Sequence, residues 1–335
     1  MPEKIFAIIG SESLMGRELR EVLAETPFRH RVKLIGAPID SGVLSGEGDE
    51  AVLIAPLEED SLRGAQVALL AGTATSAHKA FDLVSGLDPA PSLIDLTFSL
   101  EDRPQARLRA PIAEPEDYRA PAGSVHIIAH PAAAALALLL NRLHDAVPLT
   151  RSVIQILEPA SERGLKGLHE LQKQSVGLLS FQKLPQEVFD AQLGFNLLPR
   201  YGTEALEPLE NFEMRIERHL AALLSMAGKT PMPSLRLVQA PVFHGYSMSA
   251  WIEFESKPDA DQIGEALASA EIEVRRREEE PHTNVGVAGQ SGIAVSVQPD
   301  RNDARACWFW IVADNLRLAA DNAVAVARRL VEVRE

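Results

Sequence analysis

The sequence predicts an α/β fold, with a Rossmann-type parallel-sheet domain at the N-terminus followed by an α+β domain. Apolar runs rich in β-branched residues recur at βα intervals through the first 130 residues, as expected of a parallel sheet covered on both faces. The chain opens with a strand, a glycine turn and a helix, which together begin a βαβ unit. After residue 130 the pattern changes to long amphipathic helices and alternating runs, which indicates a second domain of another class.

Each element of the first domain follows from a short apolar run or a helical repeat. Residues 5–9 are apolar and precede Gly10, and residues 17–24 place Leu19 and Val22 on one side of a helix. Further elements are strands at residues 32–36, 51–55, 66–71, 92–96 and 125–129 and a helix at 76–85. Prolines cluster between Pro104 and Pro121, which predicts a loop there.

The second domain mixes helices with strands. Pro131 stands in the first turn of a predicted helix, where proline is tolerated. The helices are expected at residues 131–143, 165–179 and 207–227, and the strands at 151–156, 235–242, 247–255, 293–298 and 306–313. The last four strands alternate as antiparallel strands do. We therefore expect residues 1–130, completed by a terminal helix at 314–335, to form one domain, and residues 131–313 to form the other.

Composition excludes several classes of protein. The chain has 335 residues and a net charge of -14, which disfavours nucleic-acid binding because the phosphates carry the same charge. The single cysteine, Cys307, rules out an intrachain disulfide and a zinc site made of several thiols, and it favours the cytoplasm. The longest apolar run, residues 132–140, is shorter than the roughly 18–20 residues that a membrane helix needs.

The turn after the first strand resembles a phosphate-binding loop. It runs from Gly10 to Gly16, and the candidate cofactor-binding residues are Gly10, Ser11, Ser13, Met15 and Gly16. Backbone N–H groups at a helix N-terminus can hold a diphosphate, and glycines let the backbone approach closely. The full fingerprint has three glycines, and Ser13 takes the middle place here. The alternative is a strand-to-helix turn that only needs two small residues.

Two acidic residues qualify the nucleotide hypothesis. Asp40 lies near the end of the second predicted strand, where an acidic residue favours NAD over NADP. Glu12, inside the turn, would repel a diphosphate. The turn therefore leaves two possibilities open: NAD or NADP binds there weakly, or neither of them binds.

Several motifs occur in the order and spacing of one known family. They are Ile8-Ile-Gly10 with Gly16, Ile94-Asp95, Ile127-Ile-Ala-His-Pro131, Glu170-Leu-Gln-Lys-Gln174, Gly194-Phe-Asn-Leu-Leu-Pro199, Pro241-Val-Phe-His-Gly-Tyr-Ser247, Val312-Ala-Asp-Asn-Leu-Arg317 and Asn322-Ala-Val324. The sequence resembles the aspartate-semialdehyde dehydrogenase family over almost its full length. The resemblance implies a Rossmann-like nucleotide domain, a dimerisation domain and a homodimer.

The family chemistry depends on a thiolate at the start of a helix. The resemblance implies that this thiolate attacks an acyl phosphate or aldehyde, that a histidine is the acid/base, and that NADP exchanges hydride. The family motif Asn-Pro-Asn-Cys corresponds here to His130-Pro131-Ala132-Ala133. Ala133 thus occupies the nucleophile position, and a methyl group cannot form a covalent intermediate.

Other positions of the family site also differ. Tyr246 stands for the catalytic histidine, Gln239 for the substrate-binding arginine and Glu158 for a glutamine. Glu101 and Glu213 replace a phosphate-gripping arginine and a lysine, and Asp40 aligns with the arginine that would meet the NADP 2′-phosphate. Because carboxylate and phosphate recognition depends on cations, we expect Glu101, Glu158 and Glu213 to make the cleft acidic and to repel anionic substrates.

Replacement catalytic groups are few. Cys307 lies in a strand-like apolar run, which is typical of a core cysteine. His244 lies two residues before Tyr246 and shares its side if the strand alternates, although a partly exposed or hydrogen-bonded histidine is the simpler interpretation. His130 adjoins the former nucleophile, where a packing role suits it equally well. His126 and His130 straddle a strand and a turn, so we expect no metal site.

Three interpretations follow. The first is a homodimeric paralogue that has lost the thioester chemistry. The second is an NAD(P)-dependent oxidoreductase that acts on an uncharged carbonyl with Tyr246, His130 or His244 as the proton-transfer group. The third is an interaction protein that pairs with a related dehydrogenase subunit. None of the three involves nucleic acid or a membrane.

Overall fold

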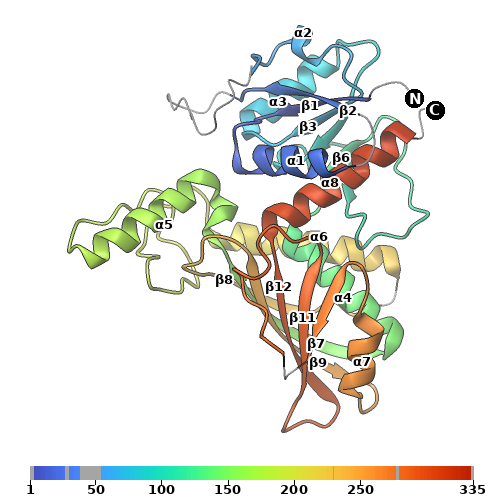
Figure 1. The fold of residues 1–335 in the computed structure, drawn as a ribbon, viewed down its shortest axis with the longest axis vertical. Helices are drawn as coiled ribbons and strands as arrows, with labels where there is room; N and C mark the ends of the chain where they lie inside the picture. Colours follow the sequence, from blue (N-terminus) through green and yellow to red (C-terminus); the bar gives the residue numbers. More distant parts are fainter. Residues whose placement is uncertain (1–3, 27–29, 38–53, 229, 277–278, 333–335) are drawn as a thin grey trace. The chain divides into compact units, whose positions relative to one another are not determined.

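The computed structural model describes residues 4–26, 30–37, 54–228, 230–276 and 279–332 (Figure 1). The chain divides into two compact units, each with its own sheet. The first unit comprises residues 1–111, 116–129 and 319–335, and the second comprises residues 112–115 and 130–318. Asp40 and most of the strand expected at 51–55 lie outside the described residues.

The first unit is built on a six-stranded sheet in the order β2-β1-β3-β4-β6-β5, with every pairing parallel. The strands are β1 (Lys4–Ile9), β2 (His30–Ile35), β3 (Val67–Leu70), β4 (Ser92–Asp95), β5 (Ala106–Arg109) and β6 (Val125–Ile128). The strand order reverses between β1 and β3, which makes this the switch point of a doubly wound sheet. Ala55 bridges to Ile35 beyond β2, in the position of an additional outer strand.

Helices cover both faces of this sheet. They are α1 (Leu14–Glu25), α2 (Glu59–Leu62), α3 (Ala74–Val84) and, from Ala319 onward, α8 (Asn315–Glu332). One apolar cluster joins Phe6 and Ile8 of β1 to Leu19 of α1 and to Ala323 of α8. A second cluster joins the alternate β1 residues to α2 and α3, so β1 is buried on both faces as its continuous apolar sequence predicts.

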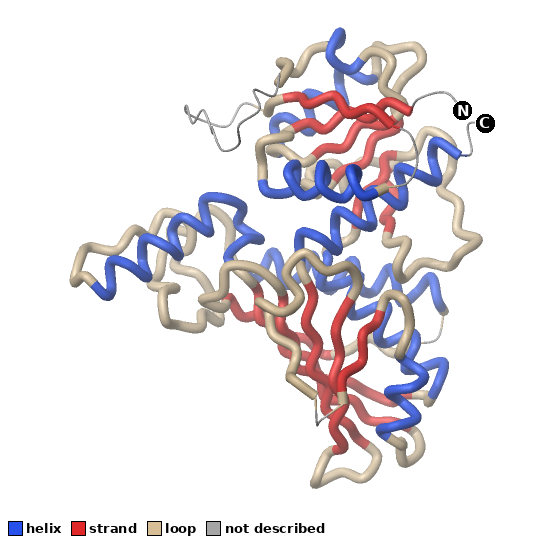
Figure 2. The backbone as a smooth tube through the Cα atoms, viewed as in Figure 1, coloured by secondary structure: helices blue, strands red, loops and turns tan. Residues whose placement is uncertain are grey.

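The second unit is built on a mixed sheet in the order β10-β11-β12-β9-β7-β8 (Figure 2). Its strands are β7 (Leu149–Glu158), β8 (Ser234–Gln239), β9 (Tyr246–Phe254), β10 (Ile272–Arg275), β11 (Ile293–Pro299) and β12 (Ala306–Ala313). The expectation that β8 is antiparallel is wrong, because β8 pairs with β7 in parallel. Alternation shows that one face of a strand is buried, but it does not set the direction of its neighbour.

Helices pack on one face of the second sheet. They are α4 (Pro131–Ala146), α6 (Leu209–Ala227) and α7 (Ala260–Leu267), and α4 contacts the other two. A further helix, α5 (Gly164–Leu179), follows the 3-10 turn η1 (Ala160–Arg163) and forms an arm with the loop after it (Figure 1). Pro208 is the N-cap of α6.

The predicted fold class is confirmed in both units, and the differences are short elements. Helix α7 and strand β10 were not expected, and neither was β5, which lies inside the proline-rich stretch. All three have eight residues or fewer, which is too short for a clear periodic signal. No helix among the described residues is both long and apolar enough to cross a membrane.

Candidate active site

A cluster of buried polar side chains lies at one end of the second unit's sheet. Glu158 ends β7, Gln239 ends the parallel neighbour β8, and Tyr246 begins the antiparallel neighbour β9. These three strand ends therefore meet at the same edge of the sheet. Glu158, Gln239 and Tyr246 have no exposed surface, so the structure brings together three of the residues that the sequence analysis singled out.

An ion pair occupies the interior of this cluster. Arg163, at the end of η1, donates a hydrogen bond from Nη2 to Glu158 Oε2 at 2.5 Å. Its Nε donates to the Tyr201 hydroxyl at 3.0 Å, and its guanidinium lies 3.2 Å from the ring centroid of Phe212. Burial raises the pKa of the Glu158 carboxyl, and the Arg163 charge opposes that shift. The chain thus supplies a cation that the sequence analysis did not identify.

Both polar groups of the Gln239 side chain form hydrogen bonds within the protein. Its Oε1 accepts from the Tyr201 hydroxyl at 2.6 Å, and its Nε2 donates to the Glu158 backbone carbonyl at 2.8 Å. A neutral amide in this network cannot clamp a carboxylate as an arginine does. The residue ties β8 to β7 instead.

Glu162 is the second carboxylate of the cluster. Its Oε1 accepts from Asn315 Nδ2 at 2.7 Å, and its Oε2 lies 3.7 Å from His130 Nε2. Burial and then the charge of Glu158 raise the pKa of Glu162 to about 7, while Arg163 opposes the shift. The structure therefore places two carboxyls, one guanidinium and one imidazole in a shared interior.

The two aromatic members of the cluster are poorly suited to accept protons from solvent. His130 is the N-cap of α4 and is 1% exposed, and its backbone N–H donates to His219 Nδ1 at 3.0 Å. Burial, reinforced by the nearby His219 and Arg163, holds the pKa of His130 well below its usual value. Burial, reinforced by the two carboxylates, raises the pKa of Tyr246 well above its usual value.

Ala133 lies in the first turn of α4. Pro131 is the first residue of this helix, and every residue from 131 to 140 is buried. The Ala133 side chain has no exposed surface. A helix N-terminus would favour a thiolate here, but the methyl group of Ala133 cannot use that field.

Two of the carboxylates expected to make the site acidic are paired. Glu158 pairs with Arg163, and Glu213 accepts from Arg236 Nη1 at 3.0 Å and from the Leu237 backbone N–H at 2.7 Å. Glu213 therefore fastens α6 to β8. Glu101 belongs to the first unit, where its charge contributes to the raised pKa of Asp95. The acidic-cleft expectation is wrong for Glu158 and Glu213, because sequence spacing did not reveal their arginine partners.

The alternative catalytic residues lie elsewhere or are inert. Cys307 is fully buried in β12, and burial followed by the charge of Asp300 raises the pKa of its thiol to about 11. His244 precedes β9, and Gly245 between His244 and Tyr246 has a φ of +82°. This left-handed residue interrupts the alternation on which a shared side depended.

In the first unit, the turn from Gly10 to Gly16 is tightly packed. A Cβ on Gly10 would lie 2.3 Å from Gly72 Cα, and one on Gly16 would lie 2.2 Å from the Gly10 carbonyl oxygen. Ser13 caps α1 by accepting from the Gly16 N–H at 2.9 Å, and its hydroxyl donates to the Ala71 carbonyl at 2.7 Å. Close packing therefore accounts for both glycines without a nucleotide.

The remaining members of this turn differ in their contacts. Ser11 is buried, and its hydroxyl has no hydrogen-bond partner among the described residues. Met15 packs against the core cluster that contains β1. Glu12 Oε1 accepts from the Ala37 N–H at 2.9 Å, so this carboxylate is anchored next to the loop. The turn lies at the switch point, where doubly wound sheets bind ligands.

Sequence reasoning missed Glu162, Arg163, Tyr201 and Asn315. A weak signal was available in Glu158-Pro-Ala-Ser-Glu-Arg163, where Glu158 ends a strand and two further charged residues follow within five positions. Tyr201 and Asn315 come from distant segments, and only the tertiary fold brings them to Arg163 and Glu162.

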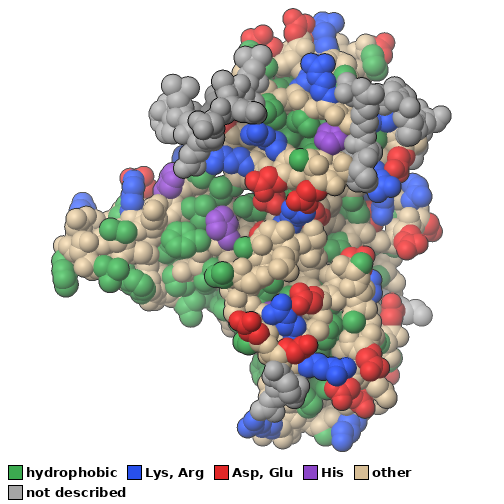
Figure 3. All heavy atoms as spheres, viewed as in Figure 1, with side chains coloured by type: hydrophobic (Ala, Val, Ile, Leu, Met, Phe, Trp, Pro, Cys, Tyr) green, Lys and Arg blue, Asp and Glu red, His purple; other side chains and the backbone are tan. Residues whose placement is uncertain are grey.

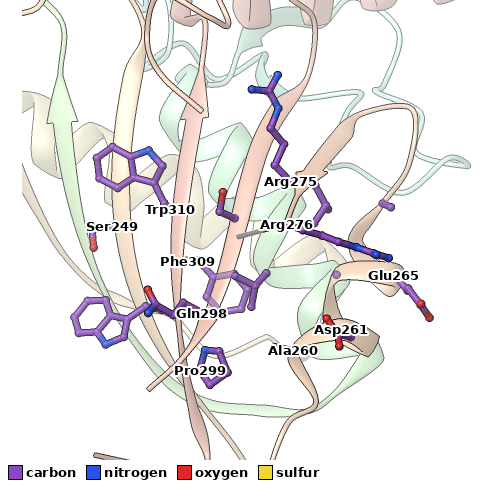
Figure 4. A pocket seen from close by; sticks show the side chains of 16 residues that line it. Ser249, Ala260, Asp261, Glu265, Arg275, Arg276, Gln298, Pro299, Phe309 and Trp310 are labelled. Atoms are coloured by element: carbon purple, nitrogen blue, oxygen red, sulfur yellow. The ribbon is translucent and has the colours of Figure 1, made fainter. Parts of the chain in front are cut away.

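Apolar side chains are exposed on the second unit outside this cluster. Val153, Trp251 and Trp308 form one row across β7, β9 and β12, and Trp310 follows on β12. We call these four residues the tryptophan face. Trp308 and Trp310 line a hollow of about 590 Å³ that α7 borders (Figure 4). Asp300 Oδ2 accepts from the indoles of Trp251 and Trp308 at 2.8 and 2.9 Å.

The α5 arm also exposes apolar residues, which gather along it in Figure 3. They are Val176, Leu179, Phe181, Phe195, Leu197 and Leu206. Phe181 is 98% exposed, which is unusual for an aromatic residue with no partner to cover it.

Known proteins share both sequence similarity and this architecture with the chain. The model of the semialdehyde dehydrogenase dimerisation domain matches residues 140–318. An aspartate-semialdehyde dehydrogenase of Rickettsia bellii is 27% identical to this chain over 97% of both proteins. A probable aspartate-semialdehyde dehydrogenase from Pseudomonas aeruginosa has a TM-score of 0.83 at 25% identity, covering 98% of this chain and 99% of that chain. The Candida albicans enzyme with NADP shares the fold, with a TM-score of 0.69 at 12% identity and 99% of both chains covered.

Proposed function

The chain belongs to the semialdehyde dehydrogenase family, and from that premise we propose that it is a homodimeric, aspartate-semialdehyde dehydrogenase-like member that has lost the thioester chemistry. The proposal places it in the cytoplasm, as its single cysteine favours.

The observation that carries the proposal is Ala133. It is fully buried in the first turn of α4, and the motif resemblance puts the family's nucleophile at this position. A covalent thioester needs a sulfur at this point, and alanine has none. The one thiol of the chain, that of Cys307, is buried and has a raised pKa, so its thiolate is scarce at neutral pH.

The surrounding site supports the same conclusion. Gln239 and Glu158 bond to Tyr201 and Arg163, and these bonds fill the positions at which the resemblance expects substrate contacts. Tyr246 stands in place of the acid/base histidine, and burial raises its pKa, so its hydroxyl stays protonated at neutral pH and cannot accept a proton as the histidine does. This last point also weighs against an oxidoreductase that uses Tyr246 for proton transfer.

We place the nucleotide site, if NADP or NAD binds, at the Gly10–Gly16 turn and expect low affinity. The turn lies at the switch point and opens helix α1, which supports binding. Glu12 opposes it, because its carboxylate is held at the loop by the Ala37 N–H. Titration of the purified chain with NADPH and NADH, read by fluorescence and thermal shift, tests this part of the proposal.

Dimerisation is supported by the second unit's exposed apolar surface. The tryptophan face lies on the side of the sheet opposite α4 and α6, with Trp308 45% and Trp310 37% exposed. Large exposed apolar patches mark sites of protein association. We propose a second copy of this chain as the partner, because the matching family model is a dimerisation domain. A related dehydrogenase subunit is the alternative partner, and co-purification of such a subunit would favour it.

Turnover is the direct test of the lost activity. We expect the purified chain, supplied with aspartate semialdehyde, phosphate and NADP, to form no NADPH above the rate without protein. The Rickettsia bellii relative assayed alongside is the positive control. Turnover by the wild-type chain that scales with protein concentration and is lost in the Cys307→Ser variant would overturn the proposal, because it would show thioester chemistry at the chain's one thiol.

A further inference from the structure

Three side chains of the buried cluster converge on one point. His130, Glu158 and Glu162 each offer a ligand atom, and these three atoms lie within 4.8 Å of one another. His130 comes from the start of α4, Glu158 from the end of β7 and Glu162 from η1. Elements of ordered secondary structure thus bring together a nitrogen and two carboxylates.

Neighbouring groups donate a hydrogen bond to one oxygen of each carboxylate. The other oxygen is left at the point where the three side chains converge. Arg163 donates to Glu158 Oε2, and Asn315 donates to Glu162 Oε1. Glu162 Oε2 then lies 3.7 Å from His130 Nε2. The His130 backbone is itself held by His219. Such outer hydrogen bonds are how proteins orient metal ligands.

Two buried polar atoms at this point have no hydrogen-bond partner among the described residues. They are Glu158 Oε1 and the Tyr246 hydroxyl oxygen, and neither residue has exposed surface. The Tyr246 hydroxyl does lie close to both carboxyls, where its interaction with them opposes the rise of their pKa values, but neither contact has the geometry of a full hydrogen bond. Leaving such groups without well-formed hydrogen bonds in the interior is unfavourable, and a ligand at this point would satisfy them.

We propose that His130, Glu158 and Glu162 bind a divalent first-row transition-metal ion of the zinc class, with Tyr246 as the fourth ligand. A nitrogen with two carboxylate oxygens suits zinc and its neighbours, whereas magnesium and calcium prefer oxygen alone. Ligand atoms about 2.1 Å from zinc in a tetrahedron lie about 3.4 Å apart. The 3.7 Å between His130 Nε2 and Glu162 Oε2 closes to that value with a small side-chain movement.

Charge balance explains the role of Tyr246. When both carboxyls are ionised, they and the Arg163 guanidinium carry one net negative charge, and a divalent ion turns this into one positive charge. Coordination of Tyr246 as the phenolate, with its proton released to solvent, makes the cluster neutral. A buried cluster without net charge avoids the desolvation cost of an uncompensated ion.

This inference goes beyond the proposed function, and the two are tested by different readouts. Metal binding is measured without substrate or cofactor, whereas loss of the thioester chemistry is measured by turnover. Failure of the metal site would leave the Ala133 argument intact.

The test is titration of the chelator-treated full chain with Co²⁺ and then with competing Zn²⁺, read by visible absorption and thermal shift. We expect one ion per chain, the intense absorption of four-coordinate Co²⁺, and displacement by Zn²⁺. His130→Asn and Glu162→Gln should each weaken binding by at least tenfold, as should Tyr246→Phe, which removes only the hydroxyl. His169→Asn, at an exposed histidine of α5, is the matched control and should bind as the wild type does.

Two results would overturn the proposal. One is the absence of saturable binding by the folded wild-type chain at micromolar metal. The other is equal affinity in the wild type and in the folded Tyr246→Phe and Glu162→Gln variants, which would place the ion on surface groups. The first result is obtained with the wild-type chain alone, so the proposal can be refuted even when a variant misfolds.

Discussion

The Arg163 guanidinium donates to the Glu158 carboxylate at 2.5 Å in the interior of the second unit. The Glu158 side chain has no exposed surface, and 10% of the Arg163 side chain is exposed. A buried pair of this kind is stable only while both partners are present, because one charge alone would lack both water and a counterion. The Glu158 charge therefore depends on Arg163 for its compensation in the interior.

Removing one partner should be costly. We expect Arg163→Met to lower the free energy of unfolding by about 3–5 kcal/mol, because it strands the Glu158 carboxylate. The double variant Arg163→Met/Glu158→Gln should recover part of that loss. Urea denaturation followed by circular dichroism measures both.

Arg151→Met is the matched control for this experiment. Arg151 pairs with Glu253 at 2.6 Å, but its side chain is 69% exposed and Glu253 keeps a second partner in Arg305. The expected change is below about 1 kcal/mol. Equal losses in Arg151→Met and Arg163→Met would show that burial of the Arg163 pair carries no special energy.

His126 in the first unit should make stability depend on pH. Arg109 Nη1 lies 3.1 Å from His126 Nδ1, and since a guanidinium only donates, Nδ1 must be unprotonated. Burial, then the Arg109 charge, lowers the pKa of His126 to about 4. The unfolded chain, with a pKa near ~6.5, binds more protons between these values, so stability falls as pH drops from about 6.5 to 4.

His126→Gln isolates this contribution. Glutamine keeps an acceptor for Arg109 but does not titrate, so the variant should lack a pH-dependent loss on the order of 3 kcal/mol. The measurement is the difference between wild-type and variant unfolding free energies at pH 7 and at pH 4.5. A difference that does not change with pH would contradict the neutral, buried state of His126.

Charges on the tryptophan face should dissociate the proposed homodimer. Trp308→Glu or Trp310→Glu places a carboxylate in the apolar contact, and we expect at least about 2 kcal/mol, or ~30-fold, weaker association. Light scattering after size exclusion should report two chains for the wild type and one for these variants. Met214→Glu, at a residue of α6 that is 58% exposed, is the matched control, and monomers in this variant as well would shift the interface away from the tryptophan face.

The large elements could be predicted from sequence because their signals are local. The apolar run of β1 predicts a buried strand, and the helical repeat of α4 predicts a buried helix. The fold class followed from the order of such elements along the chain. The parallel pairing of β8 with β7 did not follow, because strand direction depends on connections and partners rather than on the strand's own alternation.

The site could be predicted only in part. Glu158, Gln239 and Tyr246 were identified because motifs around them resemble one family, and the structure places all three at one sheet edge. Asn315 was missed because no local pattern marks a residue whose partner, Glu162, lies more than 100 positions away. Arg163 lies only five residues from Glu158, but nothing in the sequence shows that the two side chains are buried together. Charges deduced one residue at a time therefore gave too acidic a site.

The proposed loss of the thioester chemistry at Ala133 is tested most directly by trapping the covalent intermediate. The wild-type chain and Cys307→Ser are incubated with aspartate semialdehyde and NADP and examined by intact-protein mass spectrometry after acid quenching. The account predicts no acyl adduct on either protein, because Ala133 has no sulfur and Cys307 is buried with a pKa of about 11. A stoichiometric acyl adduct on the wild type would contradict it, and loss of that adduct in Cys307→Ser would identify Cys307 as the nucleophile.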